Sequence, residues 1–249
     1  MPDVVAIIPA RYASTRLPGK ALAPIAGMPM IRHVYERARR AAGIARTLVA
    51  TDDHRIADAV RAFGGDVVMT GAHATGTDRL AEVAAGLDAA IVVNVQGDLP
   101  LLDPGAVSAC VAAFRDAPEL AMASLMTPIR EPSEHANPNV VKVVTGADGY
   151  ALYFSRSPLP YWRGDRGARP LGHRHIGLYA YRRATLLALA AAPRSPLERA
   201  EELEQLRALE GGVRIRMVEV DSAPPEVDTA EDLERVRRLV EGSPMSTRP

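Results

Sequence analysis

The chain has 249 residues, of which 47% are hydrophobic, 24% charged and 4% aromatic. Its 30 basic residues balance 30 acidic ones, so no bulk charge draws it to nucleic acid or a membrane surface, and so few aromatic rings argue against a platform for single-stranded nucleic acid. A single cysteine, Cys110, excludes an internal disulfide framework, and no apolar run approaches the 18 residues of a membrane-spanning helix. We therefore expect a cytoplasmic protein with no nucleic-acid or membrane partner.

The first predicted strand, residues 4–8, ends in a loop that carries three cations, Arg11, Arg16 and Lys20. The loop lacks the glycines of a Walker motif and of a dinucleotide-binding turn. Arginine can hold phosphate oxygens through two hydrogen bonds and lysine acts as a point charge, so this loop is a candidate phosphate site. A solvated basic surface loop is the alternative, and the loop alone does not decide between them.

Strands and helices alternate along the next 100 residues or so. Helices are predicted at residues 30–42, 55–63, 78–87 and 104–114, and strands at residues 47–50, 66–69, 90–95 and 121–125. This alternation indicates a doubly wound, mostly parallel sheet. The run at 90–95 is continuously apolar, which is typical of a central strand covered on both faces.

Asp98 lies just beyond that central strand, after Gly97. Open α/β sheets bind ligands at this place, outside the carboxyl ends of their strands. A helix cap is the alternative role, but Asp103 is better placed to cap the helix that begins near Pro104. We therefore expect Asp98 to be a metal ligand.

The second half of the chain has a different pattern of predicted elements. Residues 140–144 and 150–156 predict an antiparallel hairpin, which could form a dimer surface or pack as an ordinary sheet edge. A strand follows at 173–181, where His173 and His175 share one face. A zinc site at these histidines is disfavoured because no further ligands stand at a matching spacing.

Ser195 and Glu198 form a capping box, which predicts a helix that continues through Arg207 with most of its charges solvated. A strand at 213–218 precedes a last helix, capped by Thr229 and ending near residue 240. Asp228, just before that cap, is a second candidate carboxylate. Residues 243–249 are polar and rich in Pro and Ser, so a flexible tail is expected there.

Five segments together resemble one family. They are Pro9-Ala10-Arg11 through Pro18-Gly19-Lys20, residues 93–98, residues 153–156, residues 175–179 and residues 227–233. In this order they are similar to the 3-deoxy-manno-octulosonate cytidylyltransferases, also called CMP-Kdo synthetases. The resemblance implies an α/β, Rossmann-like nucleotidyltransferase fold with a mixed, mostly parallel central sheet and a smaller antiparallel layer. It also implies one domain at 1–242, in which residues 135–190 form that inserted layer for sugar binding and dimerisation.

The implied reaction transfers the cytidylyl group of CTP to 3-deoxy-D-manno-octulosonate (Kdo) and releases pyrophosphate, for lipopolysaccharide biosynthesis. The resemblance further implies Mg²⁺ as cofactor and a homodimer.

Asp98 and Asp228 are the implied metal ligands and, with Arg11 and Lys20, the implied catalytic residues. The implied nucleotide-binding residues are Ala10, Arg11, Arg16, Lys20, Thr75, Gly76, Arg79 and Gln96. The implied sugar-binding residues are Gln96, Arg156, His175, Tyr179, Glu204 and Gln205.

The chain departs from the family pattern at two places. Leu99 stands where an acidic residue usually follows the metal aspartate, which puts a hydrogen bond near the metal in doubt. Residues 75–79 read Thr-Gly-Thr-Asp-Arg instead of Ser-Gly-Thr-Glu-Arg, which is a conservative change.

Other functions are less well supported by the sequence. A sister enzyme that activates a sialic acid is the nearest alternative, and Arg156, His175, Glu204 and Gln205 favour Kdo. A non-catalytic nucleotide-binding protein would not need both Asp98 and Asp228. The chain lacks the glycine fingerprint of an NAD-dependent oxidoreductase and the Gly-x-Ser-x-Gly elbow of a serine hydrolase.

Overall fold

The structure is a computed structural model that describes residues 3–13 and 16–242. The tail predicted at 243–249 lies outside these residues. The strands are β1 (Val4–Ala10), β2 (Pro24–Ile25), β3 (Met28–Pro29), β4 (Arg46–Thr51), β5 (Val67–Met69), β6 (Ile91–Asn94), β7 (Met122–Ile129), β8 (Lys142–Thr145), β9 (Ala151–Ser155), β10 (Gly172–Arg182) and β11 (Ile215–Glu219). The helices are η1 (Lys20–Leu22, a 3₁₀ turn), α1 (Met30–Arg40), α2 (His54–Ala62), α3 (Gly76–Ala85), α4 (Pro104–Asp116), α5 (Pro132–Ala136), α6 (Arg183–Ala191), α7 (Pro196–Glu201), α8 (Gln205–Glu210) and α9 (Ala230–Gly242).

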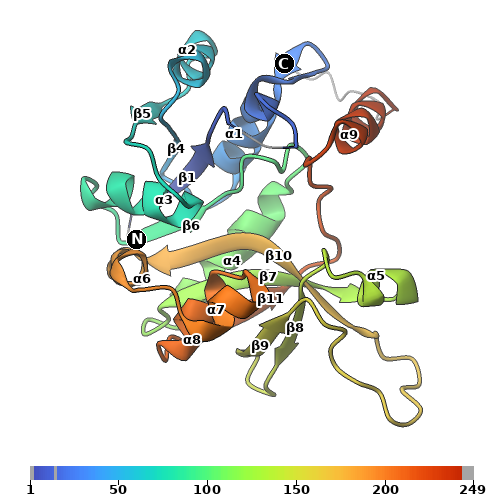
Figure 1. Ribbon diagram of the computed structural model, residues 1–249. Helices are drawn as coiled ribbons and strands as arrows, with labels where there is room; N and C mark the ends of the chain where they lie inside the picture. Colours follow the sequence, from blue (N-terminus) through green and yellow to red (C-terminus); the bar gives the residue numbers. More distant parts are fainter. Residues whose placement is uncertain (1–2, 14–15, 243–249) are drawn as a thin grey trace.

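A mixed sheet runs through the described part of the chain in the order β11-β7-β10-β6-β1-β4-β5 (Figure 1). The pairs β6-β1, β1-β4, β4-β5 and β11-β7 are parallel, whereas β10 runs antiparallel to both of its neighbours, β6 and β7. In this register Ile7 of β1 lies opposite Leu48 of β4 and Asn94 of β6. The predicted fold class is confirmed.

The alternation of side chains along β1 explains why helices cover both faces of the sheet. Ile8 packs in a core cluster with residues of α1 and α4, and its neighbour Ile7 packs in a second cluster with residues of α3 and α6. Both isoleucines are fully buried. Burying one such side chain contributes roughly 1.5–3 kcal/mol, so these apolar strands fix the layers.

A third, smaller cluster attaches the C-terminal helix to α1 and to the short β2-β3 sheet that precedes α1. Ile25 of β2 and Met30 of α1 pack with Val227, Leu233 and Val236. Helix α9 therefore lies beside the start of α1 (Figure 1), and the loop that precedes α9 returns to the carboxyl ends of the central strands.

The predicted antiparallel hairpin is confirmed as β8 and β9. It is not a separate sheet, because β8 also pairs with β10. The hairpin thus continues the main sheet away from the β1–β4 side (Figure 1).

The prediction of one helix from Ser195 through Arg207 is wrong, whereas the expected solvation holds for Glu202 and Glu204, which are exposed. The helix breaks at Glu202, which has a φ of 52° in the left-handed region, so α7 and α8 are two short helices. Glu198, Gln205 and Arg207 are buried rather than solvated. Helix α6, which follows β10 directly, was not predicted. The capping box of Ser195 and Glu198 is confirmed.

None of the helices in the described ranges, 3–13 and 16–242, has the length and apolar character needed to cross a membrane.

Candidate active site

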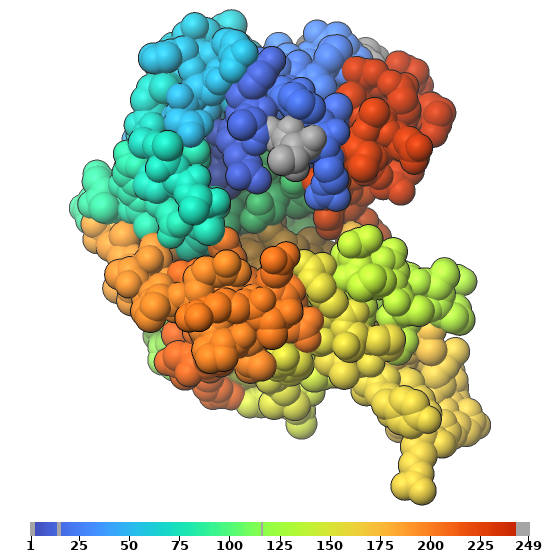
Figure 2. All heavy atoms as spheres, viewed as in Figure 1, coloured from blue at the N-terminus to red at the C-terminus, as the bar shows by residue number. Residues whose placement is uncertain are grey.

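A cleft separates the β1–α2 part of the molecule from the part that contains α7, α8 and the hairpin (Figure 2). Three adjoining cavities of about 360, 220 and 950 Å³ lie along it. The first cavity lies where β1 and β6 end. It shares Gln96 and Glu204 with the second cavity, and Arg16 and Asp228 with the third.

The loop after β1 is closed by its own backbone. The Gly19 N–H donates to the Tyr12 carbonyl at 2.9 Å, and Gly19 has a φ of 70°. A Cβ at this position would meet the Tyr12 ring at 3.1 Å, so glycine suits both the turn and the close approach. This turn starts η1 and aims its first residue, Lys20, into the first cavity.

Lys20 lies at the junction of three segments that are distant in sequence. Its Nζ is 2.8 Å from Asp98 Oδ2, 3.2 Å from Asp228 Oδ1 and 3.2 Å from the Val227 carbonyl oxygen. Arg16 Nη2 lies 3.0 Å from the second oxygen of Asp228. The backbone joins the same segments, since the Val227 N–H donates to the Asp98 carbonyl at 3.0 Å. The two predicted metal carboxylates therefore converge on one cation.

Burial by itself would lower the pKa of Lys20, but the carboxylates of Asp98 and Asp228 outweigh it. The pKa of the ammonium group is raised above its ordinary value, and the lysine stays charged at neutral pH. Its positive charge offsets the repulsion between the two aspartates, whose side chains are 27% and 32% exposed.

The predicted nucleotide-binding residues meet around the first cavity. Arg11, Thr75, Gly76 and Arg79 line it, as do Ala10, Arg16, Lys20 and Gln96. Thr75 caps α3 by accepting from the Asp78 N–H at 3.1 Å. Arg79 is only 3% exposed, and its Nη2 donates to Asp52 at 2.8 Å while its Nη1 donates to Thr70. Its guanidinium therefore also braces the wall of the cavity.

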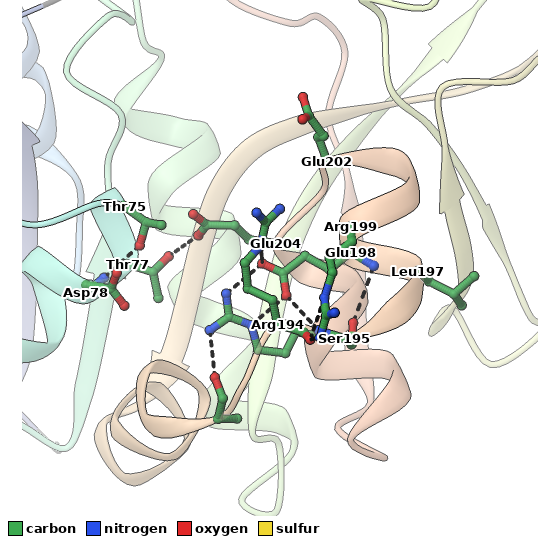
Figure 3. Close-up of polar contacts among 12 residues, drawn as sticks. Thr75, Thr77, Asp78, Arg194, Ser195, Leu197, Glu198, Arg199, Glu202 and Glu204 are labelled. Carbon is green, nitrogen blue, oxygen red and sulfur yellow. Dashed lines mark hydrogen bonds and ion pairs between the residues drawn. The ribbon is translucent and has the colours of Figure 1, made fainter.

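Four of the six predicted sugar-binding residues line the second cavity: Gln96, Tyr179, Glu204 and Gln205. Glu204 accepts a hydrogen bond from Thr77 of α3, so the contact crosses the cleft (Figure 3). Gln205 is buried, and its amide nitrogen has no hydrogen-bond partner. An unpaired buried donor costs roughly 1–3 kcal/mol.

Arg156 lies away from these four residues and lines the third cavity. Its Nε donates to the Glu201 carbonyl at 2.8 Å and its Nη1 to the Pro138 carbonyl at 3.1 Å. The backbone N–H of Arg156 also donates to the Glu201 carboxylate at 2.9 Å. Arg156 does not line the second cavity, but its Nη2 lies 3.5 Å from the carbonyl oxygen of Glu202, which does.

His175 lines none of the three cavities. It is 7% exposed, and its Nε2 lies 2.9 Å from the Ser124 hydroxyl. Its ring packs 5.0 Å from the Phe154 ring and 5.3 Å from the Tyr179 ring, measured between centroids. Burial, with a contribution from the Arg174 charge, lowers the pKa of His175 to about 3, so the ring is neutral. In this geometry His175 supports Tyr179 from behind.

Sequence reasoning missed several residues of the cavities. His73 lines the first cavity and contacts the Glu82 carboxylate. Asn94 and Tyr181, which come from neighbouring strands, line the second cavity together with Arg207. The polar end of the apolar β6 strand was a signal for Asn94, whereas His73 lies in a loop with no periodicity.

No group of three or more His, Cys, Asp or Glu side chains arranged to hold a metal ion occurs in residues 3–13 and 16–242. Any ion at Asp98 and Asp228 thus needs further ligands from substrate or water, which is how Mg²⁺ is commonly bound. Leu99, the departure next to Asp98, is 2% exposed and packs in the core cluster beneath α4.

A family model for cytidylyltransferases matches residues 5–215. The chain belongs to the cytidylyltransferase family. It is 55% identical to the 3-deoxy-manno-octulosonate cytidylyltransferase of Syntrophotalea carbinolica, with 96% of this chain and 99% of the relative covered. The enzyme of the same name from Trichlorobacter lovleyi is 52% identical, with 96% and 100% covered.

A solved structure supports this membership of the cytidylyltransferase family. CMP:2-keto-3-deoxy-manno-octonic acid synthetase, described in complex with CTP, is 48% identical and superposes with a TM-score of 0.93. The match covers 96% of this chain and 99% of that one. The resemblance inferred from the five sequence segments is therefore confirmed.

The buried His175 predicts a loss of stability in acid. Its pKa is about 3 in the folded protein and 6.5 in the unfolded chain, so the unfolded chain binds more protons below pH 6.5. This one group should lower the free energy of unfolding by about 2 kcal/mol between pH 7 and pH 5. Urea denaturation at both pH values tests this, with His175→Gln as the comparison. An equal drop in the variant and the wild type would contradict the assignment.

Proposed function

We propose that this protein transfers the cytidylyl group of CTP to Kdo and releases pyrophosphate. The observation that carries the proposal is the convergence of Lys20, Asp98 and Asp228 in the first cavity. Relatives that are more than half identical over nearly the whole chain bear the name of this activity. The product would serve lipopolysaccharide biosynthesis.

The triphosphate of CTP would lie at the loop after β1. Arg11 and Arg16 are exposed cations at the first cavity, and Lys20 is the cation at its floor. Arginine grips phosphate oxygens in pairs and lysine adds a point charge, so the three together match a polyanion. Ala10, Thr75, Gly76, Arg79 and Gln96 would contact the rest of the nucleotide.

Asp98 and Asp228 would hold Mg²⁺. The fit is supported by their geometry, because both carboxylates already point to one positive charge, the Lys20 ammonium group, at 2.8 and 3.2 Å. When bound, the metal neutralises phosphate charge and lowers the pKa of the attacking hydroxyl. Lys20 would then move its contacts from the carboxylates to the phosphate oxygens.

Kdo would occupy the second cavity, against Gln96, Tyr179, Glu204 and Gln205. A sugar acid presents many hydroxyl groups, which suit polar lining residues such as Glu204 and Tyr179. Gln96 lines both this cavity and the first one, so a sugar here has its reactive hydroxyl near the nucleotide. Arg156 would meet the acid from the third cavity, and His175 would act by holding Tyr179.

The chemical step needs positioning and charge neutralisation more than proton transfer by the protein. The anomeric hydroxyl attacks the α-phosphorus in line with the departing pyrophosphate, and negative charge spreads over the phosphate oxygens. Arg11, Arg16 and Lys20 stabilise that charge. We assign no side-chain base.

We also propose that the protein is a cytoplasmic homodimer and that residues 135–190 serve sugar binding and dimerisation. Leu152 on β9 and Tyr161 in the following loop are 66% and 87% exposed, which leaves apolar surface available to a second copy. Sedimentation velocity should give the mass of two chains; a single-chain mass at micromolar concentration contradicts the dimer. Cell fractionation tests the compartment.

The direct test of the function is pyrophosphate release by the purified protein with Mg²⁺ and CTP. Kdo, a sialic acid and no acceptor are compared. Release that requires Kdo is the expected result. Release only with the sialic acid would move the activity to the alternative acceptor, and no release with any acceptor despite CTP binding would contradict catalysis.

Asp98→Asn should fold normally and lose turnover by about 100-fold or more, because it removes negative charge from the proposed metal site. Lys20 keeps Asp228 as its partner in this variant. Asp103→Asn is the matched control, since Asp103 caps α4 and asparagine caps equally well. Comparable turnover of the two variants would contradict the metal assignment of Asp98.

Arg156→Ala should raise the KM for Kdo more than the KM for CTP, by roughly 10-fold against less than twofold. The reason is the proposed contact between its guanidinium and the sugar carboxylate. Steady-state kinetics with each substrate varied in turn measure both values. The reverse order would reassign Arg156, and with it the third cavity, to the nucleotide.

A further inference from the structure

The turn between α7 and α8 forms one wall of the second cavity. Glu202, Leu203, Glu204 and Gln205 are consecutive residues, and all four line it. Glu202 adopts the left-handed conformation, with a φ of 52°, which residues other than glycine rarely adopt. A turn of this kind persists only where its surroundings fix it.

A buried ion pair fixes this turn from behind. Arg207 donates to Glu198 through Nε at 2.8 Å and through Nη2 at 2.6 Å, and the two side chains are 8% and 1% exposed. Figure 3 shows Glu198 next to two of its other partners, Arg194 and Ser195. The Glu198 carboxylate also accepts from Arg194 Nε and from the Ser195 N–H, both at 3.2 Å. The pair therefore spans the break and joins α7 to α8.

Arg207 extends the brace to a third helix. Its Nη1 donates to the carbonyl of Leu189 at 2.9 Å and to that of Ala192 at 3.3 Å, at the C-terminal end of α6. The guanidinium thus connects α6, α7 and α8 through bonds of fixed direction. On the other side of the turn, Glu204 accepts from Thr77 of α3 (Figure 3).

Stability alone does not account for a buried pair of this kind. Removing two charges from water is costly, and well-packed apolar residues often replace a buried ion pair without loss of stability. What apolar residues cannot supply is the direction of these hydrogen bonds. Only one of the two partners, Arg207, reaches the cavity, and Glu198 does not line it.

We propose that Glu198 and Arg207 are positioning residues that hold the 202–205 turn in the shape that binds the sugar. This inference rests on the proposed function, in which the second cavity holds the sugar acid. Within the 202–205 turn only Glu204 also lines the first cavity, so the affinity for CTP should depend on the pair much less than the affinity for the sugar does.

The test is Glu198→Gln, which keeps the size of the side chain and a capping-box residue but weakens the paired bonds to Arg207. We expect the KM for Kdo to rise about 10-fold and the KM for CTP to stay within twofold. Glu36→Gln is the matched control, because Glu36 pairs with Arg39 at 2.9 Å on the surface of α1. An unchanged KM for Kdo, or equal rises for both substrates, would overturn the proposal.

The double variant Glu198→Leu with Arg207→Met separates positioning from stability. Arg207 itself lines the cavity, so a raised KM for Kdo at a wild-type melting temperature supports positioning when Glu198→Gln, which keeps Arg207, raises this KM as well. A folded double variant with a wild-type KM for Kdo overturns it. The wild-type protein is assayed first. If it shows no Kdo-dependent release of pyrophosphate, the proposed function is contradicted, and the role of the ion pair is a separate question.

Discussion

The structure of the site depends on one cation held between two carboxylates. Lys20 lies between Asp98, at the end of the central strand, and Asp228, before the last helix. Two aspartates facing one point repel each other unless a positive charge separates them. Because Lys20 supplies that charge, segments about 80 and 130 residues apart in sequence can meet at one place. The small apolar cluster around Val227 supports the same junction from the side of α9.

The sheet explains why a second substrate can reach this junction. Parallel strands β1 and β6 deliver their carboxyl ends to the same edge, where α/β sheets bind ligands. The antiparallel strand β10 lies next to β6 and places Tyr179 opposite Asn94. Strand β10 leads directly into α6, and the carbonyl of Leu189 near the end of α6 accepts a hydrogen bond from Arg207. The first and second cavities are therefore adjacent in the cleft seen in Figure 2.

The sequence was most informative where local rules decide the structure. Apolar runs located the central strands, and the side chains of Asp103 and Ser195 located helix starts, because caps act within three residues. The break at Glu202 escaped prediction because only tertiary contacts hold a glutamate in that conformation. The burial of Arg207 escaped it too, since a charged residue at helical spacing looks solvated until its partner is known. The family resemblance identified which residues belong to the candidate site, but it did not predict what each of them contacts. His175, for example, lies behind the cavity and bonds to Ser124.

We propose that metal and triphosphate meet at the lysine–carboxylate junction. The most direct measurement is Mn²⁺ binding, followed by electron paramagnetic resonance, to wild-type protein and to Lys20→Met, each with and without CTP. Wild-type protein should bind Mn²⁺ weakly until CTP is added, because Lys20 already neutralises Asp98 and Asp228. Lys20→Met should bind Mn²⁺ without CTP at least about 10-fold more tightly than wild type. Equal affinities of the two proteins in the absence of CTP would contradict the claim.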